Sequence, residues 1–322
     1  MRSSRLYRPY RQIVALSGGV GAARFLSGLT AAVDPSTVTA IVNTGDDREF
    51  YGVLVSPDLD IVTYTLAGAI DRERGFGLAG DTFTVVERLA ALGHETWFRL
   101  GDRDFANCLH RTLRCADGAR LDEVADELRR ELRVATGILP MANEPCPTIV
   151  ELGGGRRIHF EEYLVRDGAP ADVESVDLSA AAAATPAPGV LEAIREADCI
   201  AVCPSNPVVS IGPILAVPGI REAIDASKAP VVGISPIVGG APIKGPADSL
   251  LRGIGVEVSA LGVAAHYREW IDGFVIDERD AELAEPIRAL GLDVQVTDTI
   301  MTGRERATAL ADELLALADR LA

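Results

Sequence analysis

The chain has 322 residues, 48% of them apolar, and a net charge of −16. This acidity argues against binding to nucleic acid or to an anionic membrane, and the length allows one large domain or two smaller ones. No apolar run approaches the ~18 residues of a membrane helix, and the run that follows the basic segment 1–11 stops at Ser17-Gly18-Gly19, too early for a secretory signal. The sequence therefore predicts a soluble, cytoplasmic protein.

Short β-branched runs alternate with amphipathic stretches along most of the chain. This alternation predicts βαβ crossovers and a mainly parallel sheet with helices on both faces, a Rossmann-like, doubly wound α/β fold. Ligands of such sheets bind outside the carboxyl ends of the strands. The predicted strands cover 12–16, 37–42, 199–203, 230–234, 273–276 and 293–296, and the predicted helices cover 21–32, 82–92, 190–196, 211–226, 281–290 and 304–321.

The middle of the chain has a different pattern. A charged helix is predicted over 121–132, and a β-hairpin over 148–165 turns at Gly153-Gly154-Gly155. The Ala/Pro-rich stretch 179–189 has the composition of a mobile connector. We therefore predict an inserted α+β subdomain at 104–190, which divides the nucleotide-binding core into 12–103 and 191–322.

The first predicted strand runs into a glycine-rich turn that opens a helix. Its Ser17, Gly18, Gly19 and Gly21 predict a phosphate or nucleotide site, because glycines allow close backbone approach and a helix N-terminus offers free N–H groups. A tight turn with glycines for packing alone is the structural alternative. Arg24 stands where a dinucleotide fingerprint has Gly or Ala, and no acidic residue ends the second strand in the ribose position, which disfavours a nicotinamide dehydrogenase.

Aspartates follow the second predicted strand and precede the next apolar helix. Asp46 and Asp47 come after Val42-Asn43-Thr44-Gly45, and Asp58 and Asp60 come after Ser56-Pro57. Carboxylates at neighbouring strand ends can share one divalent cation, and Mg²⁺ prefers such oxygen ligands beside substrate phosphates. Helix capping and turn formation are the alternatives for each aspartate taken singly.

Three further loops carry candidate binding residues. Arg99 precedes Gly101-Asp102-Arg103-Asp104, and its planar guanidinium can contact an anion or the edge of a heterocycle. Ser205 and Asn206 leave a strand in Cys203-Pro204-Ser205-Asn206-Pro207. Gly240 and Lys244 lie in a Gly/Pro-rich loop, where the lysine is either a phosphate contact or a solvated surface group.

Taken together and in this order, these motifs resemble 2-phospho-L-lactate transferase and phosphoenolpyruvate transferase, a family of coenzyme F420 biosynthesis. The motifs that carry the resemblance are Ser17–Gly21, Val42–Asp47, Ser56–Asp60, Leu100–Asp104, Cys203–Pro207 and Gly239–Gly245. The resemblance implies transfer of a phosphoenolpyruvate or 2-phospho-L-lactate group from a guanosine diphosphate-linked donor to the ribityl hydroxyl of the deazaflavin Fo, with release of GMP. It also implies a Mg²⁺ cofactor and a homodimer.

The resemblance assigns roles to individual residues. It implies that Asp60 and Arg99 contact Fo, although the family often has lysine at the position of Arg99. We expect Asp46, Asp47 and Asp60 to hold Mg²⁺, and the Ser17–Gly21 turn and Lys244 to bind the diphosphate oxygens. We take Asp60 and Asp47 as the catalytic candidates, and metal ligand and general base remain competing roles for Asp60.

Two further questions stay open at this stage. Related proteins with a similar first loop bind nucleotide sugars and regulate metabolism, in the manner of the gluconeogenesis factor, so a regulatory protein is the alternative function. The donor is enolpyruvyl or lactyl, and the composition, which suggests a GC-rich bacterial genome, favours enolpyruvyl.

Overall fold

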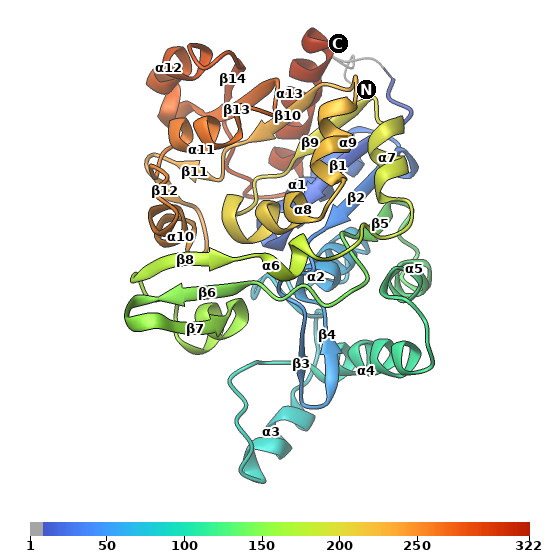
Figure 1. Cartoon of the computed structure of the whole chain (residues 1–322). Helices are drawn as coiled ribbons and strands as arrows, with labels where there is room; N and C mark the ends of the chain where they lie inside the picture. The colour runs from blue at the N-terminus through green and yellow to red at the C-terminus, as the bar shows by residue number, and fades with distance from the viewer. Residues whose placement is uncertain (1–8) are drawn as a thin grey trace.

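A computed structural model of the chain describes residues 9–322, and residues 1–8, which belong to the basic N-terminal segment, lie outside the described residues (Figure 1). Its centre is a sheet of seven parallel strands, which confirms the predicted α/β fold. In spatial order the strands are β14 (Asp293–Thr297), β13 (Gly273–Asp277), β10 (Val231–Ile234), β9 (Cys199–Val202), β1 (Ile13–Ser17), β2 (Val38–Val42) and β5 (Gly137–Pro140).

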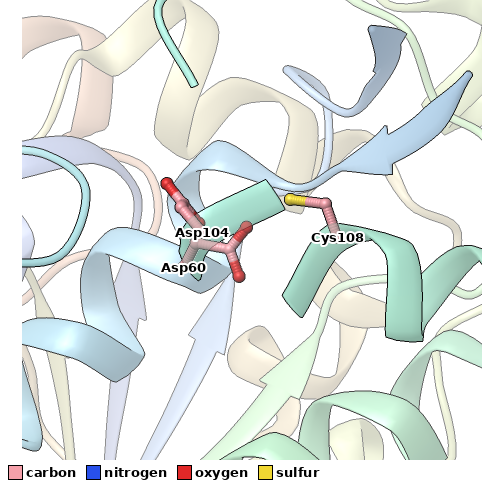
Figure 2. A group of neighbouring side chains, drawn as sticks. All are labelled: Asp60, Asp104 and Cys108. Atoms are coloured by element: carbon pink, nitrogen blue, oxygen red, sulfur yellow. The ribbon is translucent and has the colours of Figure 1, made fainter. Parts of the chain in front are cut away.

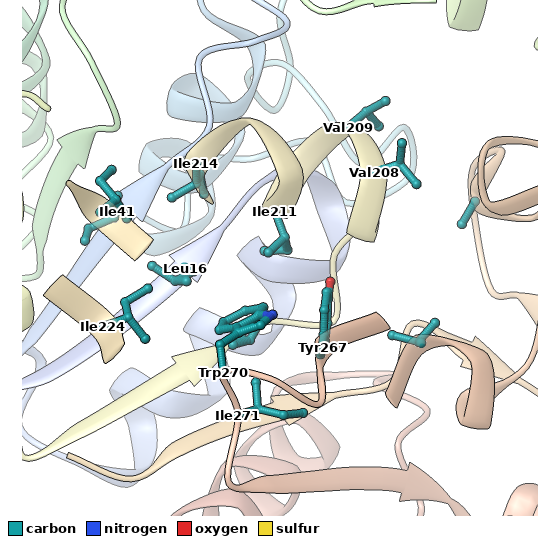
Figure 3. Packing of buried hydrophobic residues seen from close by; sticks show 14 of the residues in the cluster. Leu16, Ile41, Val208, Val209, Ile211, Ile214, Ile224, Tyr267, Trp270 and Ile271 are labelled. Carbon is teal, nitrogen blue, oxygen red and sulfur yellow. The ribbon is translucent and has the colours of Figure 1, made fainter. Parts of the chain in front are cut away.

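Both faces of this sheet are buried, as expected for parallel strands with helices on either side. Along β1, Ile13 and Ala15 join the core under α1 (Gly19–Ala32) and α13 (Arg304–Leu321). The alternate residues Val14 and Leu16 join the larger core on the opposite face. Figure 3 shows Leu16 and Ile41 of the sheet beside Ile211, Ile214 and Trp270 in that larger core.

Helices α1 and α13 lie against each other at very short range. A Cβ atom on Gly28 of α1 would fall 2.2 Å from the backbone carbon of Ala307 in α13, so glycine is required for this approach. The helix α1 begins at Gly19, two residues before the predicted start.

The helix predicted over 211–226 is broken in the structure. A single helical turn (Pro207–Ile211) leads into α8 (Gly212–Ala216), and α9 (Ile220–Ala226) follows after Pro218 and Gly219, which has φ +91°. Within residues 9–322 no single helix is long and apolar enough to cross a membrane. The bent pair of 207–216 and 220–226 satisfies length and composition, but its apolar side chains pack in the core.

The segment 104–190 supplies both a strand of the central sheet and a smaller sheet. Its strand β5 pairs with β2 and was not predicted, because Gly-Ile-Leu-Pro is short and ends in a proline at the sheet edge. The predicted hairpin is confirmed as β6 (Ile149–Leu152) and β7 (Arg156–His159), but β7 ends earlier than predicted and β8 (Val173–Asp177) adds a third antiparallel strand. The Ala/Pro-rich segment is packed, not loose: Ala181, Ala184 and Ala187 are all buried.

The region that follows β2 carries several elements of the candidate site. It contains the short hairpin β3 (Arg48–Phe50) and β4 (Val53–Val55), then α2 (Pro57–Leu66), α3 (Thr84–Ala91), α4 (Asp102–Ala116) and α5 (Leu121–Glu131). Of these elements, β3, β4, α3 and α4 project from the central sheet (Figure 1). The remaining elements are α6 (Ser179–Ala182), α7 (Val190–Glu196), β11 (Ile237–Val238), β12 (Ala241–Pro242), α10 (Ala247–Gly253), α11 (Ala260–Tyr267) and α12 (Ala284–Arg288).

Candidate functional site

The candidate site lies where the strand order of the sheet reverses. Successive strands run from β1 to β2 and β5 in one direction, and from β9 to β14 in the other, so β1 and β9 flank a topological switch point. Ligands of open α/β sheets bind in the crevice at this point. The loops after the two strands are joined there, because Ser205 Oγ donates a hydrogen bond to the Gly18 carbonyl at 2.9 Å.

The glycine turn after β1 holds a carboxylate of the chain itself. Gly19 has φ +73°, and its N–H donates to Asp58 Oδ1 with an N–O distance of 2.7 Å. A Cβ atom on Gly18 would lie 2.7 Å from Asp58 Oδ2, and one on Gly21 would lie 2.4 Å from the Pro204 carbonyl oxygen. The turn therefore serves close packing and also receives an anion at the start of α1, as the dipole of a helix favours.

An asparagine joins this turn to the first aspartate loop. Asn43 follows β2 and is fully buried, and its Nδ2 donates to Asp58 Oδ2 at 2.9 Å and to Asp46 Oδ1 at 3.3 Å. Its own Oδ1 accepts from the Gly45 N–H at 2.8 Å. From the sequence, Asn43 has no predicted role and Asp58 counts only as a member of the acidic cluster, and the structure joins the two by a hydrogen bond.

A serine links Asp47 with Asp60. Ser56 Oγ donates to Asp47 Oδ2 at 2.6 Å, and the Ser56 carbonyl accepts from the Asp60 N–H at 3.0 Å. The other oxygen of Asp47, Oδ1, is buried and has no hydrogen-bond partner among residues 9–322. An unpartnered buried carboxylate oxygen is costly, so this atom suits a ligand such as a cation or a hydroxyl group.

The carboxylate of Asp60 is bound by Arg111, a residue that no sequence motif singles out. Arg111 of α4 is 1% exposed, and both of its terminal nitrogens donate to the oxygens of Asp60. Figure 2 shows Asp60 of α2 facing Asp104 and Cys108 of α4, whose ligand atoms lie within 4.8 Å of one another. Asp104 accepts in turn from the Tyr64 hydroxyl at 2.7 Å.

Burial raises the pKa values of the acidic groups in this region. It raises the pKa of Asp58 to about 6 and that of Asp104 to about 7, and burial together with repulsion from Asp58 raises the pKa of Glu161 to about 8. The pKa values of the three predicted metal ligands also rise, mainly through burial: Asp46, Asp47 and Asp60. Within residues 9–322, Arg111 is the only lysine or arginine that is buried.

The donor set is suited to a hard divalent cation. Asp46, Asp47, Asp58 and Glu161 offer carboxylate oxygens, which are the ligands that Mg²⁺ takes, and a cation would favour their ionised forms. Among residues 9–322 no three of these four have ligand atoms within 4.8 Å of one another, so they would have to draw together around the ion. The group of Asp60, Asp104 and Cys108 is less suited. Arg111 already neutralises Asp60, and burial raises the pKa of the Cys108 thiol and so keeps it protonated.

Other predicted site residues lie around this centre. Ser17 is fully buried at the end of β1, and Asn206 caps the turn at 207–211 by accepting from the Val208 N–H at 2.9 Å. Gly240 has φ +77° in the exposed β11–β12 turn. The exposed Lys244 extends towards the loop after α2, with its Nζ 3.2 Å from the position of a Cβ atom on Gly75.

Arg99 lies over an aromatic ring at the start of α3. Its guanidinium carbon lies 4.4 Å from the centroid of the Phe83 ring, and that of Arg74 lies 4.8 Å from the same centroid. The motif that follows Arg99 is structural in part: Asp102 accepts from the Thr84 and Val85 N–H groups and so caps α3.

Residues 13–312 match the family model described as 2-phospho-L-lactate transferase CofD. The chain belongs to this family. A phosphoenolpyruvate transferase of Streptomyces coelicolor is 47% identical over 96% of this chain and 99% of its own length. A 2-phospho-L-lactate transferase of Methanosarcina mazei is 39% identical over 93% of this chain and 98% of its own.

The fold of this chain is similar to that of a solved structure of another protein. A UPF0052 protein of Bacillus halodurans superposes with a TM-score of 0.65 over 96% of this chain and 100% of its own, at 19% identity. This likeness concerns the fold alone. The comparisons give no support to the nucleotide-sugar-binding regulatory alternative.

Proposed function

We propose that this protein transfers a phosphoenolpyruvate group from a guanosine diphosphate-linked donor to the ribityl hydroxyl of the deazaflavin Fo, releasing GMP, a step of coenzyme F420 biosynthesis. Membership of the transferase family supports the reaction class. The enolpyruvyl donor is preferred over the lactyl donor because relatives named phosphoenolpyruvate transferase reach 46–47% identity, against 39% for those named 2-phospho-L-lactate transferase.

The buried acidic cluster at the switch point is the observation that carries the mechanism. Phosphoryl transfer requires positioning and charge neutralisation more than covalent assistance. We assign Asp46 and Asp58 as ligands of Mg²⁺, which when bound would neutralise the diphosphate charge, and we leave Asp47 to the acceptor hydroxyl. Asp58 replaces Asp60 of the sequence-based set, because Arg111 occupies both oxygens of Asp60.

Asp60 and Asp47 remain the residues proposed for the acceptor. Arg111 favours the ionised form of Asp60, which is the form that orients a hydroxyl group. The acceptor oxygen forms a bond to the phosphorus that carries the phospho-acid, the bond from that phosphorus to GMP breaks, and the hydroxyl proton passes to a carboxylate. Asp47 is the proposed acceptor of that proton, because its Oδ1 has no partner among residues 9–322.

Binding of the two substrates is assigned to the surrounding loops. Ser17, Gly18, Gly19 and Gly21 with Ser205 and Asn206 form the proposed nucleotide side, and Gly240 and Lys244 extend it. Binding of the diphosphate to the Gly19 amide requires Asp58 to turn from that amide towards the metal. Arg99 is the proposed Fo contact beside Asp60, and Phe83 holds its guanidinium in place. We also carry over a homodimer and a cytoplasmic location as proposals from the family resemblance.

The test is incubation of the pure protein with Fo, Mg²⁺ and either the enolpyruvyl or the lactyl guanosine donor, followed by mass analysis of the product. Asp47→Asn and Asp60→Asn should each lower kcat by about 10²–10⁴-fold, the usual range for loss of a general acid–base group. Asp225→Asn, on the exposed face of α9, is the control and should keep full activity. Absence of product with both donors, or full activity of both site variants, would contradict the proposal.

A further inference from the structure

A cavity lies beside the candidate site, along α1. Its volume is about 460 Å³, within the range of small-molecule sites. Three segments far apart in the sequence form its wall: α1, the loop that follows α2, and the start of α13. None of the catalytic or metal-binding assignments above uses a residue of this wall.

The wall is rich in cationic side chains. Arg24 of α1, Arg72 of the loop and Arg304 of α13 all line the cavity. Within residues 9–322, none of these three arginines forms an ion pair. Asp71 is the acidic residue of the wall, and Arg74 neutralises it through an ion pair of 2.8 Å.

This grouping is unusual for a chain with 47 acidic and 31 basic residues. Acidic side chains are in excess, and many surface arginines form ion pairs with them, such as Arg306 with Asp298 at 3.0 Å and Arg252 with Asp248 at 3.0 Å. Three like charges that face one hollow repel one another, and a bound anion relieves that repulsion. Arginine also offers paired donors that match carboxylate and phosphate oxygens.

Polar groups that complement an anion surround the three arginines. Ser27, Thr65 and Thr302 contribute to the wall. Gly303, the residue before α13, also lines it, and because no side chain caps this helix, the first backbone N–H groups of α13 are available to an anion. Lys244 adds a fourth positive charge at the rim, because its Nζ lies close to Gly75 of the same wall.

We infer that this cavity binds a small polyanion that carries several carboxylate or phosphate oxygens. The inference rests on the cavity and its charges and does not depend on the proposed transfer reaction. The cavity adjoins the candidate site, because Val20 lines it and directly follows Gly19. An anion bound there is therefore placed to affect the glycine turn.

Isothermal titration of the full chain at low salt tests this inference, with inorganic pyrophosphate and tricarballylate as separate probes. Arg24→Gln/Arg304→Gln should bind at least one probe about tenfold more weakly than the unchanged protein, or ~1.4 kcal/mol. Arg306→Gln removes an arginine from the same helix outside the cavity and should stay within about twofold.

The two probes separate the chemical sources. Tighter binding of pyrophosphate assigns the cavity to phosphate groups, and tighter binding of tricarballylate assigns it to carboxylates. Equal affinity of the double variant and the unchanged protein, or no binding of either probe at concentrations up to ~10 mM, would overturn the inference. The three arginines are exposed, so their replacement should leave the thermal unfolding midpoint unchanged. An unchanged midpoint verifies that each variant is folded.

Discussion

Replacement of Arg111 by methionine should destabilise the protein strongly. The guanidinium is 1% exposed, donates to both oxygens of Asp60, and also donates to the Leu54 carbonyl at 3.1 Å. Methionine fills much of the same volume but leaves a buried carboxylate without its counterion. Breaking a buried pair in this way costs about 3–5 kcal/mol of the free energy of unfolding.

Urea unfolding, followed by circular dichroism, measures this cost for four proteins: unchanged, Arg111→Met, Asp60→Asn, and the double variant. The double variant buries no unpaired charge, so it should lose less than about 2 kcal/mol and show a coupling energy of at least ~2 kcal/mol. Arg252→Met breaks an exposed pair with Asp248 and should cost no more than about 1 kcal/mol. A loss below ~1 kcal/mol for Arg111→Met, or strict additivity in the double variant, would refute the reasoning.

Two further outcomes are expected from the site. Because burial raises the folded-state pKa of Asp104 to about 7 and that of Glu161 to about 8, the folded protein binds protons more tightly than the unfolded chain. The metal-free protein should therefore gain thermal stability as the pH falls from 8 to 6, and a flat scanning-fluorimetry profile would contradict these shifts. Gly21→Ala should cost about 1–3 kcal/mol in urea unfolding, because its methyl group would meet the Pro204 carbonyl, whereas Gly303→Ala, with no atom within 4 Å, should have little effect.

The central strands were predictable because their residues are buried on both faces. The run Ile13–Ser17 is apolar at consecutive positions up to Leu16, which is typical of a strand buried on both faces, and the glycines that follow it mark its end. The strands that escaped prediction are β5 at the sheet edge, β8 of the small antiparallel sheet, and the two- and three-residue strands β3, β4, β11 and β12. Such short segments are defined by their pairing partners rather than by their own composition.

In the candidate site, too, the residues marked by local sequence were predicted, and the residue brought in by packing was not. The aspartates were selected because they follow strand ends, and the structure places Asp46, Asp47, Asp58 and Asp60 in one buried region. Arg111 was not selected because it lies in a helix 51 residues from Asp60, and only the packing of α4 against α2 brings them together. No local pattern distinguishes it from the exposed arginines of the same helix.

The position of β1 has a consequence for synthesis of the chain. This strand needs neighbours on both edges, and the second one, β9, pairs Cys199 with Ile13. The helix that follows it, α1, packs against α2 and also against α13, which lies much further along the chain at Arg304–Leu321. The chain as far as Val202 must therefore leave the ribosome before β1 gains its second neighbour, and until then the nascent chain carries an open, apolar strand edge that is prone to aggregate.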